Sequence, residues 1–184
     1  AFGWFLNVYI EIFRGTPMIV QSMVIYYGTA QAFGISIDRT LAAIVIVSIN
    51  TGAYMSEIVR GGIYAVDKGQ FEAATALGMT HGQTMRKVVL PQVIRNILPA
   101  TGNEFVINIK DTSVLNVISV VELYFTGNTV ATQNFKYFPT FTIIAVIYFV
   151  LTFTITRILR YIERRLDSDT YTTGANQMQV NEVK

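Results

Sequence analysis

Uncharged apolar stretches constrain this chain more than any other feature, because a backbone inside a bilayer must satisfy its own hydrogen bonds, as a helix does. A span needs about 20 mostly apolar residues. Residues 137–159 supply them, with no charge from Ile143 to Phe153. Residues 40–59 are nearly as clear, and residues 17–35 are apolar with polar interruptions. The sequence therefore predicts at least three membrane helices.

A fourth stretch, residues 88–109, has the length of a span but a different character. Prolines, charged residues and asparagines interrupt it, among them Pro91, Arg95, Pro99, Asn103, Glu104 and Asn108. Such groups are costly against lipid, so this segment must face protein or a watery path. The chain is predicted to be an all-α polytopic membrane protein, with its membrane domain in residues 1–165.

The composition agrees with a membrane protein and excludes several functions. Charged residues make up 14% of the 184 residues, whereas soluble domains average about 25%. A net charge of only +2 does not suggest a nucleic-acid surface. The absence of cysteine excludes disulfides, zinc–thiolate sites and thiol catalysis. The single histidine, His81, falls in a polar loop, where a solvated or interface residue is expected.

Lysine and arginine are distributed unequally between the two sides of the predicted spans. One side carries most of them: Arg60, Lys68, Arg86, Lys87, Arg157, Arg160, Arg164 and Arg165. The opposite side carries Arg39, Lys110 and Lys136. Because positive residues favour the cytoplasmic side, we expect the loop 60–87 and the polar tail 166–184 to be cytoplasmic.

The loop after the second span has the local signals of two short helices. Asp67 with Gln70, and Thr80 with Gln83, have the spacing of capping boxes. Gly78 lies between them and suits the left-handed residue that ends a helix. We therefore predict a short helix, a sharp glycine turn and a second helix.

Several boundaries are predicted from the same signals. Gly61-Gly62 should end the second span, and the missing amide of Pro91 should bend the helix that reaches it. Residues 112–138 are expected to form a helix on the outer side followed by a loop. After Ser168 the chain is expected to leave the last helix as a mobile tail.

The polar loop resembles a known motif. Glu72-Ala73-Ala74 is followed by Gly78, Val88 and Leu90-Pro91, in the register of the EAA loop of type I ABC-importer permeases. Further segments resemble the polar amino-acid branch of these permeases: Glu11 to Pro17, Asn50 to Tyr54, Glu57-Ile58, Arg60-Gly61-Gly62, Gly102 to Phe105, Lys110 to Ser113 and Val120 to Leu123. The family's first membrane helix is absent, so the sequence is expected to lack its beginning.

The resemblance implies the helix bundle of a type I ABC-importer permease, with cytoplasmic EAA coupling helices, in a bacterial inner membrane. It implies a subunit of an ATP-driven amino-acid importer that forms the translocation path and is not itself an enzyme. It implies no cofactor in this chain, because ATP and Mg²⁺ would be bound by a partner. The implied partners are two ATPase subunits, a second permease subunit, identical or not, and an extracytoplasmic amino-acid-binding protein. The sequence does not identify the amino acid.

Two groups of candidate site residues follow. The resemblance assigns ATPase docking to Glu72, Ala73, Ala74, Leu77, Gly78 and Thr80. The polar groups near the spans are candidates for the substrate path: Asn50, Tyr54, Glu57, Asn103, Glu104, Asn108, Lys110 and Asp111.

These path candidates have a chemical rationale and a structural alternative. Carboxylates near the path can hold the ammonium of an amino acid, and amides can bind either end of it. Asn50, Tyr54 and Glu57 are four and three residues apart and share one helical face. Structural roles also stay open, because Glu57 could pair with Arg60, and the charges of residues 110–111 could form a gate or an ion pair of the bundle.

Rival functions explain less of the sequence. A secondary transporter or channel would share the buried polar groups, but it gives no reason for the capped loop, and no internal repeat is found. An intramembrane enzyme would need a motif such as His-Glu-x-x-His or Gly-x-Ser-x-Gly, and neither is present. An accessory scaffold would not stimulate an ATPase. The chain has no Gly-x-x-x-x-Gly-Lys loop of its own.

Overall fold

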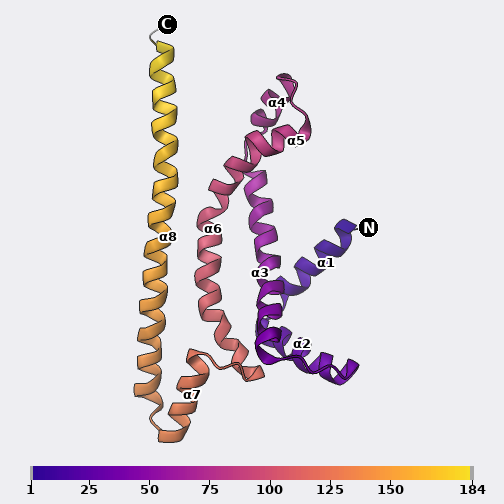
Figure 1. Cartoon of the computed structure of the whole chain (residues 1–184), viewed down its shortest axis with the longest axis vertical. Coiled ribbons are helices and arrows are strands. Elements are labelled where there is room, and N and C mark those ends of the chain that lie inside the picture. The colour runs from indigo at the N-terminus through magenta and orange to yellow at the C-terminus, as the bar shows by residue number, and fades with distance from the viewer. Residues whose placement is uncertain (1, 183–184) are drawn as a thin grey trace. The chain divides into compact units, whose positions relative to one another are not determined.

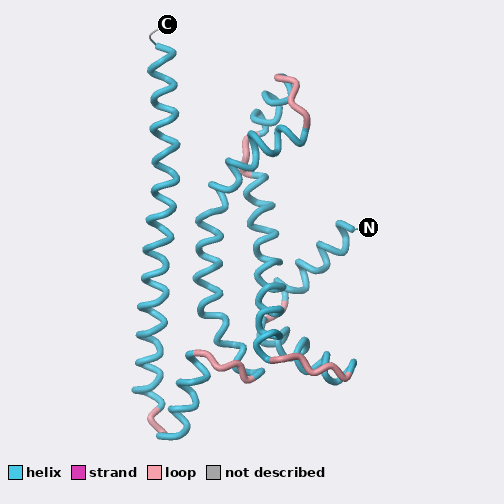
Figure 2. Tube along the Cα trace, in the orientation of Figure 1, coloured by secondary structure: helices cyan, strands magenta, loops and turns pink. Residues whose placement is uncertain are grey.

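The computed structural model describes the backbone of residues 2–182 and the side chains of residues 3–166. The described backbone consists of helices joined by short loops, without a strand (Figure 2). In chain order the elements are α1 (Phe2–Gly15), α2 (Met18–Phe33), α3 (Arg39–Tyr64), α4 (Lys68–Ala76), α5 (His81–Thr84), the π-helical turn η1 (Met85–Val89), α6 (Leu90–Asp111), the 3₁₀ turn η2 (Thr112–Ile118), α7 (Leu123–Asn134) and α8 (Tyr137–Glu182) (Figure 1).

The chain divides into two compact units. The first unit is Ala1–Glu57 with Glu104–Phe153, and the second is Ile58–Asn103 with Thr154–Lys184. The division falls inside three long helices, α3, α6 and α8, so that each of them belongs partly to one unit and partly to the other. The path candidates except Asn103 fall in the first unit, and the EAA loop falls in the second.

Two described helices are long and apolar enough to cross a membrane, namely Arg39–Tyr64 and Tyr137–Leu166. A third crossing is possible if His81–Ile118 and Leu123–Asn134, bent by 55° at their junction, form one broken span. The predicted first span is represented by α2, which has 16 residues and a length of about 24 Å. This is shorter than the roughly 30 Å of bilayer hydrocarbon, so the four-span division stays a prediction.

The core of the first unit forms where α2, α3 and η2 meet. Ala42, Ala43 and Ile46 lie on one face of α3 and are buried with Leu115 and Ile118 of η2. Their spacing of three to four residues is the helical period that places side chains on one face. The two alanines keep this face narrow, which lets the tight 3₁₀ turn pack close to it.

The core of the second unit joins the end of α3 to the start of α6. Val66, Val89 and Val93 are buried in it, and Gly62 of α3 lies against Ile97 of α6. A Cβ added to Gly62 would come within 2.2 Å of an Ile97 side-chain carbon. The prediction that Gly61-Gly62 ends the helix is therefore wrong, because α3 continues to Tyr64 and Gly62 serves close packing. A glycine inside a helix costs about 1 kcal/mol relative to alanine, and the burial of Ile97 offsets this.

The segment 112–138 differs from the prediction of one helix and a loop. It contains η2 and then α7, which begins where the Glu122 carboxylate accepts hydrogen bonds from the amides of Tyr124 and Phe125. Gly127 of α7 receives the side chain of Ile144 of α8. Helix α7 was not predicted, because its N-cap, Glu122, is a single acidic residue between apolar neighbours.

The last helix also runs further than predicted. Its backbone stays helical to Glu182, whereas the sequence predicts an exit after Ser168. Elongating an existing helix costs little compared with starting one, and no proline interrupts this stretch. The side chains of the predicted tail lie outside the described residues.

Candidate docking and transport sites

The EAA loop forms a hairpin of two short helices around Gly78 (Figure 1). Gly78 has φ +75°, a value that favours glycine because it has no Cβ. The Gly78 amide donates to the Thr75 carbonyl at 2.9 Å, and the Met79 amide donates to the Ala74 carbonyl at 3.1 Å. These bonds satisfy the carbonyls at the end of α4. The predicted left-handed glycine turn is confirmed.

The two predicted capping boxes have different outcomes. Thr80 and Gln83 form a complete box, in which each side chain bonds the other residue's backbone. Asp67 caps α4 by accepting from the Gly69 amide at 2.7 Å. The predicted return bond, from the Asp67 amide to the Gln70 side chain, is wrong. The side-chain oxygen of Gln70 instead accepts a long hydrogen bond from Gln92 at 3.5 Å.

The side chains of α4 point in two directions. Ala74 is 3% exposed and belongs to the interior of the second unit. Glu72 and Ala73 are exposed, and Leu77 at the end of α4 is 81% exposed. The Ala74 methyl group packs inside this chain, and its part in docking stays a prediction. The outward face of α4 is formed by Glu72, Ala73 and Leu77.

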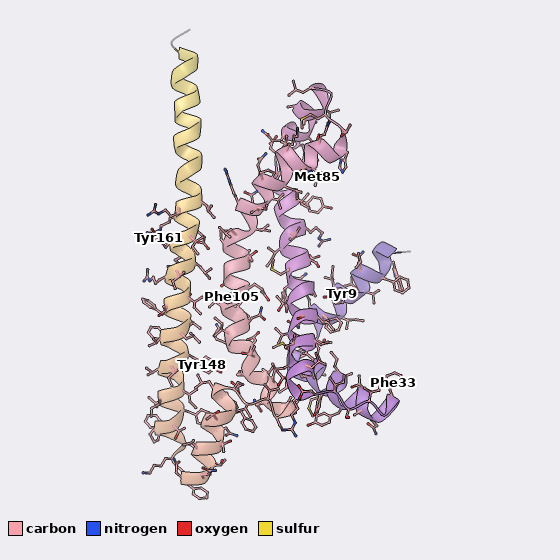
Figure 3. All side chains as sticks on the ribbon, in the orientation of Figure 1. Tyr9, Phe33, Met85, Phe105, Tyr148 and Tyr161 are labelled. Atoms are coloured by element: carbon pink, nitrogen blue, oxygen red, sulfur yellow. The ribbon has the colours of Figure 1, made fainter. Side chains whose placement is uncertain are left out.

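The helix approaching Pro91 changes register before it reaches the proline. Residues Met85–Val89 form a π turn, in which the Leu90 amide donates to the Met85 carbonyl five residues back (Figure 3 labels Met85). Pro91 has no amide hydrogen and cannot complete the next bond. The bend predicted at Pro91 stays a prediction, and the structure shows a π turn just before this proline, a feature often found at functional positions.

In the first unit, Asn50 is held by the corner between α1 and α2. Its side-chain amide donates to the Gln21 side-chain oxygen at 3.0 Å and to the Phe13 carbonyl at 3.3 Å. Gln21 in turn donates to the carbonyls of Phe13 and Thr16 at 2.9 and 2.8 Å. Gln21 and Asn50 are 6% and 8% exposed. Asn50 therefore has a structural role, because its polar atoms serve the turn before Pro17.

Tyr54 and Glu57, on the same face of α3, meet Arg14 at the end of α1. The Arg14 guanidinium lies 5.5 Å from the centre of the Tyr54 ring and 3.3 Å from a Glu57 carboxylate oxygen. This ion pair was not foreseen, since the sequence suggested Arg60 as the nearest cation. One turn away, the Tyr9 hydroxyl of α1 donates to the Ile49 carbonyl of α3 (Figure 3).

The polar face of α6 is arranged differently. Glu104 is 8% exposed, and among the described residues no hydrogen bond or ion pair reaches its carboxylate. One turn later, the Asn108 side-chain oxygen accepts from the Thr51 hydroxyl of α3 at 3.2 Å. Lys110 and Asp111 are exposed, as is Asn103 in the second unit. The Glu104 carboxylate has little exposure and, within residues 3–166, no counter-charge at hydrogen-bond distance, so a cation that reached it would be favoured there.

An open cavity of about 420 Å³ lies beside Asn108 in the first unit. Mainly apolar side chains line it, together with a few polar groups: Phe105, Asn108, Ile109, Thr112, Glu122, Leu123, Tyr148 and Leu151. The Tyr148 hydroxyl donates to the Glu122 carboxylate at 3.1 Å. The size and the mixture of apolar walls with few polar groups are those of small-molecule sites. Sequence reasoning missed Glu122 and Tyr148, which lie 26 residues apart.

The described residues 3–166 contain no group of three or more histidine, cysteine, aspartate or glutamate side chains that could hold a metal ion.

Known proteins resemble this chain over most of its length. The family of binding-protein-dependent transport system inner membrane components matches residues 1–168. The glutamine transport system permease protein GlnP of Escherichia coli is 43% identical over 169 residues, covering 89% of this chain and 77% of the relative. The arginine transport system permease protein ArtQ of Bacillus subtilis is 39% identical over 168 residues, covering 91% and 77%.

Solved structures have the same fold. An amino acid ABC transporter crystallised with histidines matches with a TM-score of 0.82 and 46% identity, over 86% of this chain and 74% of that one. An inward-facing structure of the MetNI methionine ABC transporter matches with a TM-score of 0.74 over 87% and 73%. At 21% identity this second likeness shows the fold alone.

Proposed function

We infer the function of this chain from one premise: it belongs to the family of binding-protein-dependent transport system inner membrane components. It is therefore a membrane-spanning permease subunit of an ABC importer, with the helical fold that the resemblance implied. The family also implies an ATPase and a binding protein as partners. ATP hydrolysis is accordingly proposed for a partner chain, and no cofactor is proposed for this one.

The proposed substrate is a polar amino acid. The relatives named above include permeases of glutamine and arginine transport systems, and the most similar structure cited is an amino acid transporter. We propose two ATPase subunits and a second permease subunit, which is either a copy of this chain or a related one. The EAA hairpin and the end of α8 are proposed to face the cytoplasm, where ATP is.

Docking of the ATPase is proposed for the outward face of the hairpin. Glu72, Ala73 and Leu77 are exposed there, while Gly78 and Thr80 fix the turn that presents them. Ala74 supports this face from inside. Leu77 is 81% exposed and offers apolar area whose burial against a partner would be favourable, and this observation carries the docking proposal.

The substrate path is proposed to include Glu104 and the cavity beside Asn108. A carboxylate that is buried without a counter-charge can be compensated by the ammonium of an amino acid. Lys110 and Asp111, exposed at the end of α6, and Asn103 are retained as path candidates. Asn50, Tyr54 and Glu57 are proposed to shape the path indirectly, because the α1–α2 corner engages their polar groups.

Reconstitution into liposomes tests this function. The full-length chain would be assembled with the ATPase and binding protein encoded beside it, and ATP hydrolysis measured across a panel of amino acids. Stimulation by one loaded binding protein is expected. In the Glu104→Gln variant, substrate uptake should weaken while basal hydrolysis persists. The exposed Glu11→Gln variant is the control and should transport normally. No association with any ATPase would overturn the proposal.

A further inference from the structure

The polar contact between α4 and the π turn has no part in the roles proposed so far. Gln92 lies one residue after Pro91, in the first turn of α6. Its side-chain amide donates to the Val88 carbonyl in the π turn at 2.9 Å and also points to the Gln70 side-chain oxygen of α4 at 3.5 Å. One side chain thus bridges the helix approaching the proline and the first turn of α4. All three residues belong to the second unit.

The bridge sits where the helix backbone is weakest. The Leu90 amide is committed to the Met85 carbonyl by the π turn, and Pro91 has no amide to offer. The carbonyls of this turn therefore have fewer backbone donors than those of a regular helix. The Gln92 side chain adds a donor to the Val88 carbonyl in this irregular stretch. Turns of this kind are common at functional positions.

The apolar contacts around the bridge hold the same elements together. Val66, Val89 and Val93 form a buried cluster against which Phe71 of α4 and Met85 of the π turn are packed. These contacts are non-directional, so they allow α4 to slide on the π turn. The Gln70–Gln92 contact is directional and fixes which turn of α4 meets which turn of the helix.

We propose that Gln92 is a positioning residue, which transmits movement of the docked hairpin into α6 through Gln70 and the Val88 carbonyl. The inference rests on the proposed function, because it assumes that the ATPase moves α4. Without the bridge, α4 moves relative to the buried valine cluster, and this movement is not passed on to α6. ATP hydrolysis then continues with less transport for each ATP consumed. Loss of folding alone would lower both activities together.

The test compares three variants of the complete transporter in liposomes. Gln92→Met keeps the length of the side chain and removes both donors. The amino acid transported per ATP should fall by about twofold to fivefold, with fivefold the size expected for one full hydrogen bond, because the contact with Gln70 is long and exposed. Gln92→Lys retains a donor and should recover most of the ratio. Gln133→Met, an exposed glutamine of α7, is the matched control and should resemble the wild type.

The outcomes separate this inference from the proposed function. A wild-type transporter that is stimulated by binding protein, with an unchanged ratio in Gln92→Met, would overturn the inference alone. A wild-type chain that no ATPase stimulates would overturn the proposed function first. If Gln92→Met does not assemble, Gln70→Leu on the exposed side of α4 carries the test. It removes only the acceptor and should lower the ratio in the same direction by a smaller factor, and an unchanged ratio there would also overturn the inference.

Discussion

The α1–α2 corner and the α4–α5 hairpin are both chain reversals, but their backbones are satisfied by different groups. In the corner, buried side chains of Gln21 and Asn50 bind the carbonyls that precede Pro17. In the hairpin, the turn at Gly78 and the Thr80 capping box satisfy the backbone locally. The hairpin therefore leaves its outward side chains available to another protein, whereas the polar side chains of the corner are hydrogen-bonded within the chain.

This difference teaches how to interpret polar residues in a membrane protein. Asn50 and Glu104 are equally buried, at 8% exposure, yet Asn50 has partners within the chain and Glu104 has none among the described residues. Burial alone therefore does not tell which polar groups have hydrogen-bond partners inside the chain. Four predictions test the comparison, ordered from the substitution with the largest expected free-energy cost to the one with the smallest.

Gln21→Leu should have the largest effect, because it removes donors to two carbonyls and the acceptor for Asn50 in a buried site. Leaving such groups unsatisfied costs about 1–3 kcal/mol each, so thermal unfolding of the purified chain in detergent should shift down by several degrees. Gln31→Leu, an exposed glutamine of the same helix, is the control. Equal melting temperatures for the two variants would show that the corner does not depend on its side chains.

Gly78→Val should follow, and it should act on coupling more than on stability. A β-branched residue at φ +75° carries a penalty of at least about 1–2 kcal/mol, which the turn relieves by moving. Stimulated ATP hydrolysis should then fall roughly tenfold. Gly61→Val is the matched change, because an added Cβ at Gly61 also meets nothing within 4 Å and only the backbone angle differs. If Gly78→Val has no larger effect than Gly61→Val in α3, the hairpin needs no left-handed turn.

Leu77→Ser should weaken association with the ATPase without affecting the fold of this chain. Losing the burial of one leucine costs about 1.5 kcal/mol, or roughly tenfold in Kd. Phe135→Ser is the control, because Phe135 is equally exposed, at 83%, but lies between α7 and α8. Affinities measured by titrating the ATPase against reconstituted permease should separate the two. If both variants bind as well as the wild type, the outward face of the hairpin is not an anchor.

Glu57→Gln should have the smallest effect. The Arg14 side chain is 42% exposed, and ion pairs near solvent contribute at most about 1 kcal/mol. Melting temperature and substrate KM should therefore change little, with the residual effect reduced by salt. A loss as large as that of Gln21→Leu would mean that charge, rather than amide hydrogen bonding, holds the corner.

The features that the sequence predicted well depend on local geometry. Gly78, Thr80 and Gln83 act within a few residues of one another, so their spacing contains the whole signal. The family motif added the role of the loop, which spacing alone does not supply.

The features that the sequence missed depend on approaches between distant segments. Gly62 was predicted to end a helix, but it lies inside α3 and packs against the side chain of Ile97, 35 positions later in the chain. The hydrogen bond from Asn50 to Gln21, 29 residues earlier, was not predicted either. A glutamine inside an apolar stretch was the available clue, because a buried amide needs partners. Partners at such separations have no fixed spacing in a single sequence.

Protection of position 77 from labelling tests the central claim most directly. The chain has no cysteine, so Leu77→Cys and Phe135→Cys each place a single thiol on it. Labelling by a membrane-impermeant maleimide would be followed on this chain in an opened membrane preparation, with and without the partner ATPase. The account predicts that both thiols react in the permease alone, and that only the thiol at 77 is protected in the complex. Equal labelling of position 77 with and without the ATPase would contradict it.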